Sequence, residues 1–251
     1  MEADSLLNYA LGNGVEAFST MRNAQLPYNV ICGHQVHDVR VAVIDRPDLT
    51  REDLEGYDAF ITNLKNCAIG VRTADCIPVL LYDPQHEAVA AVHSGWKGTV
   101  RRISQHTIRA MHDTYGTNAS DLIAMIGPGI GRCSFQVGEE VVGMFRESGF
   151  PMDEIWQYDG EPVTGTMRGG HHIDLIMANK WLLESAGVRP GNIRSCNICT
   201  YEDERFYSAR REGMKCGRII NAIRIIGVAR PNCTNVSIRS GKPVPLLKNA
   251  Q

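Results

Sequence analysis

The chain has 251 residues, of which 43% are hydrophobic and 22% are charged, and its net charge at neutral pH is −2. Such a composition is typical of a globular protein with a substantial core. Because the charges are interspersed and form no basic stripe that could neutralise a duplex, nucleic acid is excluded as an expected partner.

Strand patterns dominate the first half of the chain. Residues 39–44 alternate between apolar and polar, which predicts a half-buried strand. Residues 77–82 and 88–93 are continuous apolar runs joined by a turn at Asp83-Pro84. They predict two adjacent strands that are buried on both faces. None of these runs is long enough to cross a bilayer, so no membrane is expected as a partner.

The helix after this pair of strands has recognisable ends. Thr99 is its expected N-cap, and apolar residues then keep helical spacing until Gly116, which is typical of a helix C-terminus. Further along, the pattern predicts strands at 122–126, 193–200 and 219–227 and helices at 139–148 and 175–186, the last capped by Asp174 and closed by Gly187.

Alternating strands and helices predict a single domain of the α+β (mixed α/β) class. We expect this domain to cover residues 1–238. Residues 239–251 are polar and contain Pro243 and Pro245, so we expect a partly disordered C-terminal tail.

Eight cysteines in 251 residues are too few for a disulfide scaffold. The N-terminus also lacks the basic segment and apolar run of a secretory signal. We therefore expect a cytoplasmic protein whose cysteines outside the candidate site are unpaired and largely buried, namely Cys67, Cys196, Cys199, Cys216 and Cys233.

Three side chains form a candidate metal site. His37 and Cys76 each precede a predicted strand, and His93 ends the strand that follows the one after Cys76. Antiparallel pairing of 77–82 with 88–93 would bring Cys76 and His93 to the same end of a hairpin. Three protein ligands with an open fourth position are typical of catalytic zinc, and two imidazoles with one thiolate can also hold copper.

Two other patterns predict no site. Cys196 and Cys199 form a C-x-x-C inside a predicted strand, but a closed four-cysteine site would need a second close pair. His171 and His172 are expected to face solvent.

Six motifs in a fixed order are more specific than these spacings. They are Gln35-Val36-His37, Thr73-Ala74-Asp75-Cys76, His93-Ser94-Gly95-Trp96-Lys97-Gly98, Gly127-Pro128-Gly129-Ile130-Gly131-Arg132-Cys133, Cys199-Thr200-Tyr201 and Arg210-Arg211-Glu212-Gly213 with Gly217-Arg218. Together they resemble the laccase-domain or multicopper polyphenol oxidase proteins, a family now largely regarded as purine nucleoside phosphorylases. The resemblance covers Gln35 to the last predicted strand.

The resemblance implies a function and a fold. It places the family's zinc ligands on His37, Cys76 and His93, and it implies an α/β/β/α layering with mixed sheets, similar to a deamidating bacterial toxin of cysteine-hydrolase type. The implied activities are phosphorolysis of adenosine, inosine, guanosine and methylthioadenosine to base and ribose-1-phosphate, and deamination of adenosine. Relatives are also linked to peptidoglycan editing.

The chain departs from the family pattern before Gln35. Members usually have a Phe-Ser-Thr-Arg segment followed by several tens of residues, whereas here Phe18-Ser19-Thr20-Met21-Arg22 is followed by Gln35 almost at once. The wall that this segment builds is therefore reduced or absent, which affects substrate preference.

Phosphorolysis needs an anion site. The turn 94–98 opens a helix and offers backbone N–H groups from Ser94 and Gly95, with Lys97 and Arg72 as candidate cations. Arg210 and Arg211 are the second choice. Asp75 is a candidate general acid or base, or a partner that orients a ligand histidine.

Other functions stay open. A four-copper laccase is excluded, because its clusters need more histidines than the eight present, mostly as His-x-His pairs, and the chain has none of these pairs. A copper-binding polyphenol oxidase using the same triad, a metal-free cysteine hydrolase with Cys76 as nucleophile and His93 as base, and a non-catalytic metal-binding protein remain alternatives. For the nucleoside enzyme, the expected partners are a nucleoside and phosphate, and the expected state is a monomer or small homo-oligomer.

Overall fold

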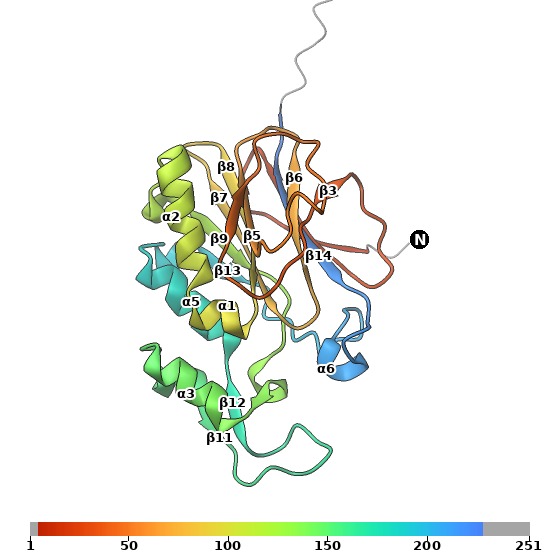
Figure 1. The fold of residues 1–251 in the computed structure, drawn as a ribbon, viewed down its shortest axis with the longest axis vertical. Helices are drawn as coiled ribbons and strands as arrows, with labels where there is room; N and C mark the ends of the chain where they lie inside the picture. Colours follow the sequence, from red (N-terminus) through yellow and green to blue (C-terminus); the bar gives the residue numbers. More distant parts are fainter. Residues whose placement is uncertain (1–4, 228–251) are drawn as a thin grey trace, which may run out of the picture.

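Two large β-sheets stack on each other, and helices cover the outer face of one of them (Figure 1). The computed structural model describes residues 5–227. The strands of the six-stranded sheet are β4 (Val41–Val43), β5 (Ala59–Thr62), β7 (Ile77–Asp83), β8 (Ala88–Ser94), β9 (Ile123–Ile126) and β13 (Ile193–Ser195). Their order across the sheet is β13-β9-β7-β8-β5-β4.

The five-stranded sheet joins the beginning of the chain to its end. Its strands are β1 (Leu6–Tyr9), β2 (Val15–Thr20), β3 (Val30–Ile31), β6 (Ala68–Thr73) and β14 (Ile219–Ile225), in the order β1-β2-β14-β6-β3. A small third sheet contains β10 (Gln136–Val137), β12 (His171–Ile173) and β11 (Trp156–Tyr158). The two large sheets are mixed, since β4–β5, β9–β13 and β3–β6 are parallel pairs and the other pairs are antiparallel.

The predicted hairpin forms the centre of the molecule. β7 and β8 pair antiparallel, with Pro78 opposite His93, and every residue of both strands is buried. Val79 packs in the core under the helices, whereas Leu80 packs in the core between the two sheets. Both faces of these strands are therefore covered, which explains why their sequences are continuously apolar.

The helices are α1 (Trp96–Val100), α2 (Ile103–Tyr115), α3 (Glu139–Glu147), α4 (Met152–Ile155), α5 (Leu175–Ser185) and α6 (Ala209–Glu212), with 3₁₀ turns at Ala119–Asp121, Arg132–Ser134 and Pro190–Asn192. α2 packs on β8 and β5, and α5 packs on β9 and on α2. Asp174 caps α5 as predicted, because its carboxylate accepts a hydrogen bond from the Met177 N–H at 2.9 Å. Gly116 ends α2 in the left-handed conformation, also as predicted.

The predicted start of the helix at Thr99 is wrong. Gly95 is the N-cap of α1, and Thr99 lies inside this helix with its hydroxyl bonded to the Gly95 carbonyl at 3.0 Å. The helix then breaks at Arg102, whose φ of 64° is left-handed, and α2 begins at Ile103. Arg102 is held there by a 2.7 Å hydrogen bond to the Ser148 carbonyl and by contact with the Trp181 ring.

Two predicted strands are shorter than expected. β4 begins only at Val41, because Asp38 accepts a hydrogen bond from the Val39 N–H and holds the preceding residues in a turn. β13 ends at Ser195, and Asn197 follows with a left-handed φ of 52°. The C-x-x-C therefore lies in a loop and not inside a strand.

The α+β class with mixed sheets is confirmed. Of the α/β/β/α layering that the resemblance implies, the two sheets and one helical layer are present. On the far side of the five-stranded sheet, none of the longer helices α2, α3 and α5 packs, and the short α6 lies near the lower end of β14 (Figure 1). The proposed limit between domain and tail at 238/239 lies outside the described residues.

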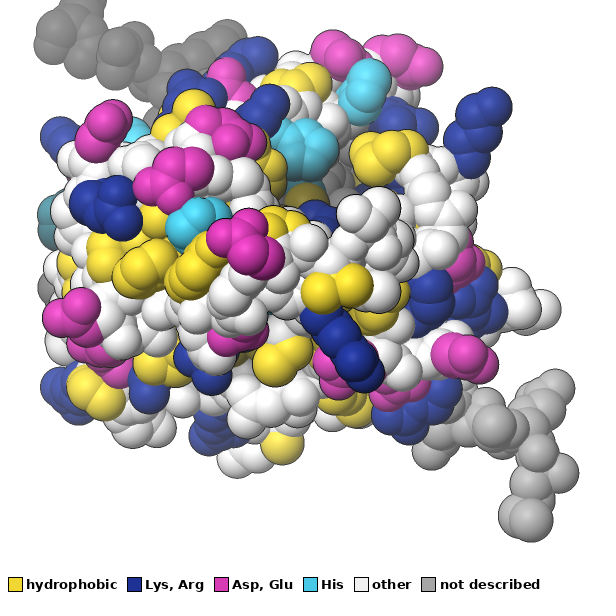
Figure 2. Space-filling model, turned by 90° about the horizontal axis from the view of Figure 1, so that it is seen from below, with side chains coloured by type: hydrophobic (Ala, Val, Ile, Leu, Met, Phe, Trp, Pro, Cys, Tyr) yellow, Lys and Arg dark blue, Asp and Glu magenta, His cyan; other side chains and the backbone are white. Residues whose placement is uncertain are grey.

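The face of the molecule seen from below has no extended patch of one charge (Figure 2). Seen from below, the molecule carries acidic and basic side chains next to each other without a broad patch of either sign (Figure 2). Within residues 5–227, no helix combines the length and apolarity that a membrane crossing requires.

Candidate metal centre

Three potential metal ligands meet at the end of the central hairpin from which α1 leaves. His37 lies in the loop between β3 and β4, Cys76 directly precedes β7, and His93 is the penultimate residue of β8. Their ligand atoms all lie within 4.8 Å of one another. The prediction that the hairpin brings Cys76 and His93 together is confirmed.

The separations suit a tetrahedral metal ion. With bonds of about 2.05 Å to nitrogen and about 2.3 Å to sulfur, a tetrahedral site places these two ligand atoms about 3.6 Å apart. His37 Nε2 lies 3.8 Å from Cys76 Sγ. His93 Nδ1 is 2.7 Å from the Asp58 carboxylate, which leaves the His93 Nε2 for a metal. The triad therefore fits a metal with three protein ligands.

Asp58 is the main residue of this site that the sequence did not reveal. Its side chain is fully buried, and besides His93 it accepts hydrogen bonds from the backbone N–H groups of Val36, His37 and Asp38 at 2.9–3.0 Å. One carboxylate thus orients the His93 ring and fixes the loop that presents His37. Asp58 stands just before β5 in no recognisable motif, so only the fold identifies it.

The triad also sets the charge of its own members. Burial opposes ionisation of the Cys76 thiol, but His93 and His37 outweigh it and lower the pKa of Cys76 to about 6. Burial opposes protonation of His93, yet the Cys76 sulfur and Asp58 raise the pKa of His93 to about 9. In the absence of metal, Cys76 and His93 are therefore a thiolate and an imidazolium at neutral pH.

This charge state predicts the pH dependence of alkylation. In metal-free protein, the rate of Cys76 alkylation by iodoacetamide should be nearly constant above pH 7, because the pKa of the thiol is about 6 and the thiolate is already formed. Below that pKa the rate should fall about tenfold per pH unit. Mass spectrometry of the Cys76 peptide measures the rate. A rate that still rises between about pH 7 and about pH 9, as for an ordinary thiol, would contradict the lowered pKa.

The glycine turn lies directly beside the triad. A Cβ atom on Gly95 would be 3.0 Å from both Cys76 Sγ and the Cδ2 atom of His37, so only glycine allows the backbone this approach. The hydroxyl of Ser94 is fully buried and pairs with Thr99 Oγ1 at 3.0 Å. Of the predicted phosphate-binding residues in the turn, Ser94 therefore directs its side chain into the protein.

Asp75 borders the site with both carboxylate oxygens engaged. It adopts a left-handed φ of 87° and accepts hydrogen bonds from the Thr200 hydroxyl at 2.7 Å and from the Arg210 backbone N–H at 2.6 Å. The contact that orients a ligand histidine thus comes from Asp58, while Asp75 ties the loop before β7 to the start of α6.

A largely apolar hollow of about 470 Å³ opens at the triad. Cys76, His37, Lys97 and Arg210 line it, and the Arg210 guanidinium lies 5.7 Å from the centre of the Phe135 ring. The remaining side chains of its wall are Ala74, Asp75, Trp96, Ile130, Phe135, Ala209, Met214 and Arg218.

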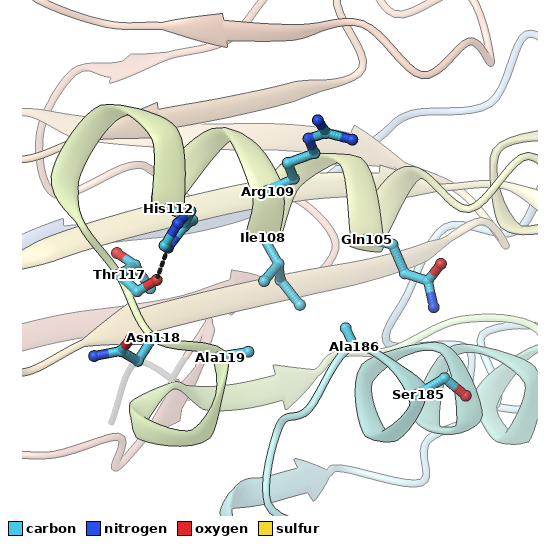
Figure 3. A pocket seen from close by; sticks show the side chains of 9 residues that line it. All are labelled: Gln105, Ile108, Arg109, His112, Thr117, Asn118, Ala119, Ser185 and Ala186. Atoms are coloured by element: carbon cyan, nitrogen blue, oxygen red, sulfur yellow. Dashed lines mark hydrogen bonds between the residues drawn. The ribbon is translucent and has the colours of Figure 1, made fainter.

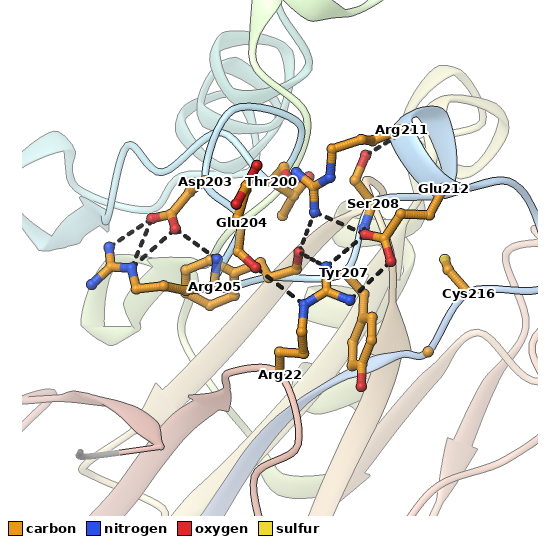
Figure 4. Close-up of polar contacts among 12 residues, drawn as sticks. Arg22, Thr200, Asp203, Glu204, Arg205, Tyr207, Ser208, Arg211, Glu212 and Cys216 are labelled. Atoms are coloured by element: carbon orange, nitrogen blue, oxygen red, sulfur yellow. Dashed lines mark hydrogen bonds and ion pairs between the residues drawn. The ribbon is translucent and has the colours of Figure 1, made fainter.

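The other two basic candidates lie elsewhere. Arg72, at the end of β6, lines a different and smaller hollow together with His37 and His93. Arg211 directs its guanidinium into the loop before α6 (Figure 4). There it donates to the carbonyls of Thr200, Tyr201 and Phe206 at 2.6–2.8 Å.

The segment after β2, where the chain departs from its family pattern, supports this same loop. Arg22 donates to both carboxylate oxygens of Glu212 at 2.7 and 2.9 Å and to the Phe206 carbonyl at 3.1 Å (Figure 4). The end of β2 in the five-stranded sheet is thereby attached to α6, the helix that carries Arg210.

The remaining cysteines only partly follow expectation. Each cysteine between residues 5 and 227 is free, as predicted. Cys67 is buried, but Cys196, Cys199 and Cys216 are only half-buried, because they lie in loops and not inside strands. Cys233 lies outside the described residues. The expectation of a solvent-facing histidine pair is wrong for His172, which is buried in β12.

A further hollow of about 390 Å³ lies away from the triad, between α2 and α5 (Figure 3). It is lined by polar side chains such as Gln105, Arg109 and His112, and the His112 ring pairs with the Thr117 carbonyl at 3.0 Å. It shares no lining residue with the candidate metal centre.

Comparison with known proteins identifies the family of the chain. A family model described as multi-copper polyphenol oxidoreductase laccase matches residues 15–226. The chain is 38% identical over 238 residues to a purine nucleoside phosphorylase of Bacteroides thetaiotaomicron, which covers 87% of this chain and 86% of the relative. It is also 38% identical over 204 residues to adenosine deaminase RL5 from an unknown prokaryotic organism, covering 78% and 74% respectively.

The fold is shared with a solved structure. The hypothetical protein YfiH of Bacillus licheniformis superposes with a TM-score of 0.77 at 25% identity, over 89% of this chain and 97% of the other. The family match extends from β2 to the end of β14 and thus includes all three members of the triad. The chain therefore belongs to the multi-copper polyphenol oxidoreductase laccase family, some of whose relatives are named as purine nucleoside enzymes.

Proposed function

We propose that this protein is a zinc-dependent purine nucleoside enzyme that catalyses phosphorolysis to base and ribose-1-phosphate and also deaminates adenosine. The convergence of His37, Cys76 and His93 at the mouth of an apolar hollow carries the proposal. The names of the relatives support the same class of substrate. Adenosine, inosine, guanosine and methylthioadenosine are the proposed nucleosides.

The triad would hold the zinc ion, which, when bound, supplies a Lewis acid with a free coordination position suited to activating water at neutral pH. The chain provides the conditions for this. Cys76 is a thiolate at neutral pH, and Asp58 holds the His93 ring with its Nε2 directed at the other ligands. Copper in the same triad is the alternative metal.

The apolar hollow would bind the purine. Trp96, Ile130 and Phe135 offer flat or apolar surfaces that exclude water around a base. Aromatic rings stack on any nucleobase. Asp75 lies at the same wall and is the proposed general acid or base. Its position is fixed by Thr200 and Arg210, so proton transfer would need little rearrangement of the carboxylate.

Cations and backbone N–H groups around the triad would bind phosphate. Lys97 and Arg210 line the apolar hollow, and Arg72 lines the smaller one. Gly95 brings the backbone closest to the triad, and Ser94 belongs to the same turn. Arg211 is proposed only as a support, since its guanidinium is engaged by three carbonyls.

One rival function has structural support. Cys76, His93 and Asp58 follow one another as thiolate, imidazolium and carboxylate, which is the arrangement of a metal-free cysteine hydrolase. A weak copper-dependent polyphenol oxidase would use the same triad. All eight histidines lie in the described part of the chain, and only one group of potential ligands forms there, so a multi-copper cluster has no second set of ligands.

A nucleoside panel tests the proposed function. Wild-type protein should convert adenosine to inosine without phosphate, and should form free base and ribose-1-phosphate when phosphate is added. Both activities should disappear with a chelator and return with zinc, because the three ligands hold the ion that both reactions require. Chromatography of the products measures both.

The rivals predict different results. Product formation that persists after verified removal of metal would favour the cysteine hydrolase. No product from any nucleoside would refute the nucleoside assignment.

The proposal includes a cytoplasmic location and a monomer or small homo-oligomer.

A further inference from the structure

A second hollow adjoins the triad, with a different chemical character from the first. Its volume is about 200 Å³, less than half that of the apolar hollow. His37 and Arg218 line both hollows, whereas His93 lines only the smaller one. The triad therefore lies between a larger apolar space and a smaller polar one.

The smaller hollow is strongly basic. Arg51, Arg72 and Arg218 line it, and its other lining residues are Gly33, His34, Gln35, His37 and His93. No carboxylate is among them. Two acids behind the wall are bound to its histidines: Glu55 to His34 Nδ1 at 2.8 Å and Asp58 to His93 Nδ1 at 2.7 Å. Three guanidinium groups around so small a space repel one another unless an anion lies among them.

Arg72 is held in place by an unusual contact. β6 has β14 on one side, but on the other side the short β3 pairs only with Ala68 and Ile69. Further along, the Gln35 amide replaces the missing strand: it accepts from the Arg72 backbone N–H at 2.8 Å and donates to the Arg72 carbonyl at 2.9 Å. The backbone that presents the Arg72 side chain is thus fixed by Gln35, which stands two residues before His37 in the chain.

Two of the three guanidinium groups have no partner in the described part of the chain. Arg51 and Arg72 form no side-chain hydrogen bond or ion pair there, unlike Arg22 or Arg205, which bind carboxylates. Both lie close to the Cys32 thiol, whose pKa burial raises to about 11 while the two arginines oppose the rise. Arg218 is fixed by the Met214 and Cys216 carbonyls at the boundary of the two hollows.

We infer that this hollow binds a phosphate dianion through Arg51 and Arg72, with Arg218 at its inner edge. The inference rests on the proposed function for the identity of the reaction, but it assigns the anion to the smaller hollow, in place of Lys97 and Arg210 in the larger hollow that receives the base. The dianion is either inorganic phosphate or the 5′-phosphate of a nucleotide. Arginine suits this role because its planar fork binds two phosphate oxygens at once.

With inorganic phosphate, the arrangement accounts for the reaction. Displacement at C1′ requires the incoming oxygen and the leaving base on opposite faces of the ribose. A phosphate oxygen forms the bond to C1′ while the C1′–N9 bond breaks, and its electron pair stays with the purine. The purine takes up the proton that hydrogen phosphate loses, so atoms and charges balance.

Substitution of the arginines tests the site. Arg51→Ala, Arg72→Ala and the double variant should raise the KM for inorganic phosphate and its Kd in calorimetry by about 10-fold to 100-fold, the effect of one lost charge-assisted hydrogen bond. The ratio of phosphorolysis to deamination should fall by a similar factor. Arg72→Lys, which keeps the charge but not the fork, should lie between wild type and Arg72→Ala.

The control is Arg109→Ala, which removes an exposed arginine of α2 that lines neither hollow at the triad and should match wild type. Zinc content and circular dichroism verify that each variant is folded. Competition by adenosine 5′-monophosphate identifies the source of the anion: if its affinity falls in the variants and that of inorganic phosphate does not, the site holds the nucleotide's 5′-phosphate.

Two results would overturn the inference: unchanged affinity for both anions in the double variant, or no binding of either anion by wild type at millimolar concentration. The calorimetric arm does not depend on turnover. If wild type binds phosphate through these arginines but converts no nucleoside, the anion site stands and the proposed function fails.

Discussion

Cys76→Ala should contain no stoichiometric zinc and should have neither phosphorolysis nor deaminase activity. The triad provides only three ligands, and the thiolate is the one that carries negative charge. Two neutral imidazoles alone bind zinc weakly, so the ion and its Lewis acidity would be lost together. Metal analysis of the purified variant and the nucleoside assay measure the two effects.

The matched control is Cys133→Ala, because Cys133 is an exposed free thiol that does not line either hollow at the triad. This variant should keep one zinc per chain and full activity. A Cys76→Ala protein that still binds one zinc would exclude the proposed ligand set. An inactive Cys76→Ala protein, combined with wild-type activity that survives chelation, would instead assign Cys76 as a nucleophile.

The central hairpin and the two candidate ligands that it carries could be predicted because their determinants are local. The turn at Asp83-Pro84 and two continuous apolar runs define β7 and β8, and antiparallel pairing then requires Cys76 and His93 to be neighbours. His37 has no such link to the hairpin in the sequence. Its assignment as a ligand depended on the family motif, and the structure shows that Asp58 connects it to His93.

The five-stranded sheet could not be predicted in the same way. β2 pairs with β14 so that Ser19 lies opposite Asn221, and no turn or short connection signals a pairing over this sequence distance. The small strands β3, β10 and β11 are too short to show a period. Their conformation is determined by the neighbours they pack against and not by their own residues.

Left-handed residues account for several of the differences at element ends. Arg102 divides the expected helix into α1 and α2, and Asn197 follows the early end of β13. His37 and Asp75 also have positive φ, and both lie at the candidate site. Such conformations are unfavourable for residues with a side chain and are maintained by surrounding contacts, which a single sequence does not display.

Asp58→Asn should weaken zinc binding by about 10-fold to 100-fold, the usual effect of removing a partner that orients a metal ligand. Each carboxylate oxygen of Asp58 accepts two hydrogen bonds. Oδ1 accepts from the His37 backbone and from the His93 ring, and Oδ2 accepts from the backbone N–H groups of Val36 and Asp38. An asparagine has one acceptor oxygen. In either amide orientation, its NH₂ group would face two N–H donors in a buried space.

Proton release distinguishes an orienting role for Asp58 from a general loss of stability. At pH 7, wild-type His93 is protonated in the metal-free state, because the Cys76 sulfur and Asp58 outweigh its burial and raise its pKa to about 9. Cys76, with a pKa of about 6, is already a thiolate. Zinc binding should therefore release about one proton per chain. In Asp58→Asn the imidazolium loses its carboxylate partner, the pKa of His93 falls, and fewer protons should be released.

Calorimetry in buffers of different ionisation enthalpy measures this number together with the zinc affinity. The control is Asp113→Asn, which alters an exposed carboxylate on α2 and should behave as wild type in both respects. If Asp58→Asn binds zinc within about twofold of wild type and releases the same number of protons, Asp58 does not orient His93 toward the metal. If Asp58→Asn lost only stability, it would bind zinc less completely but would release the wild-type number of protons for each ion bound, because the pKa of His93 in the folded molecules would then not depend on Asp58.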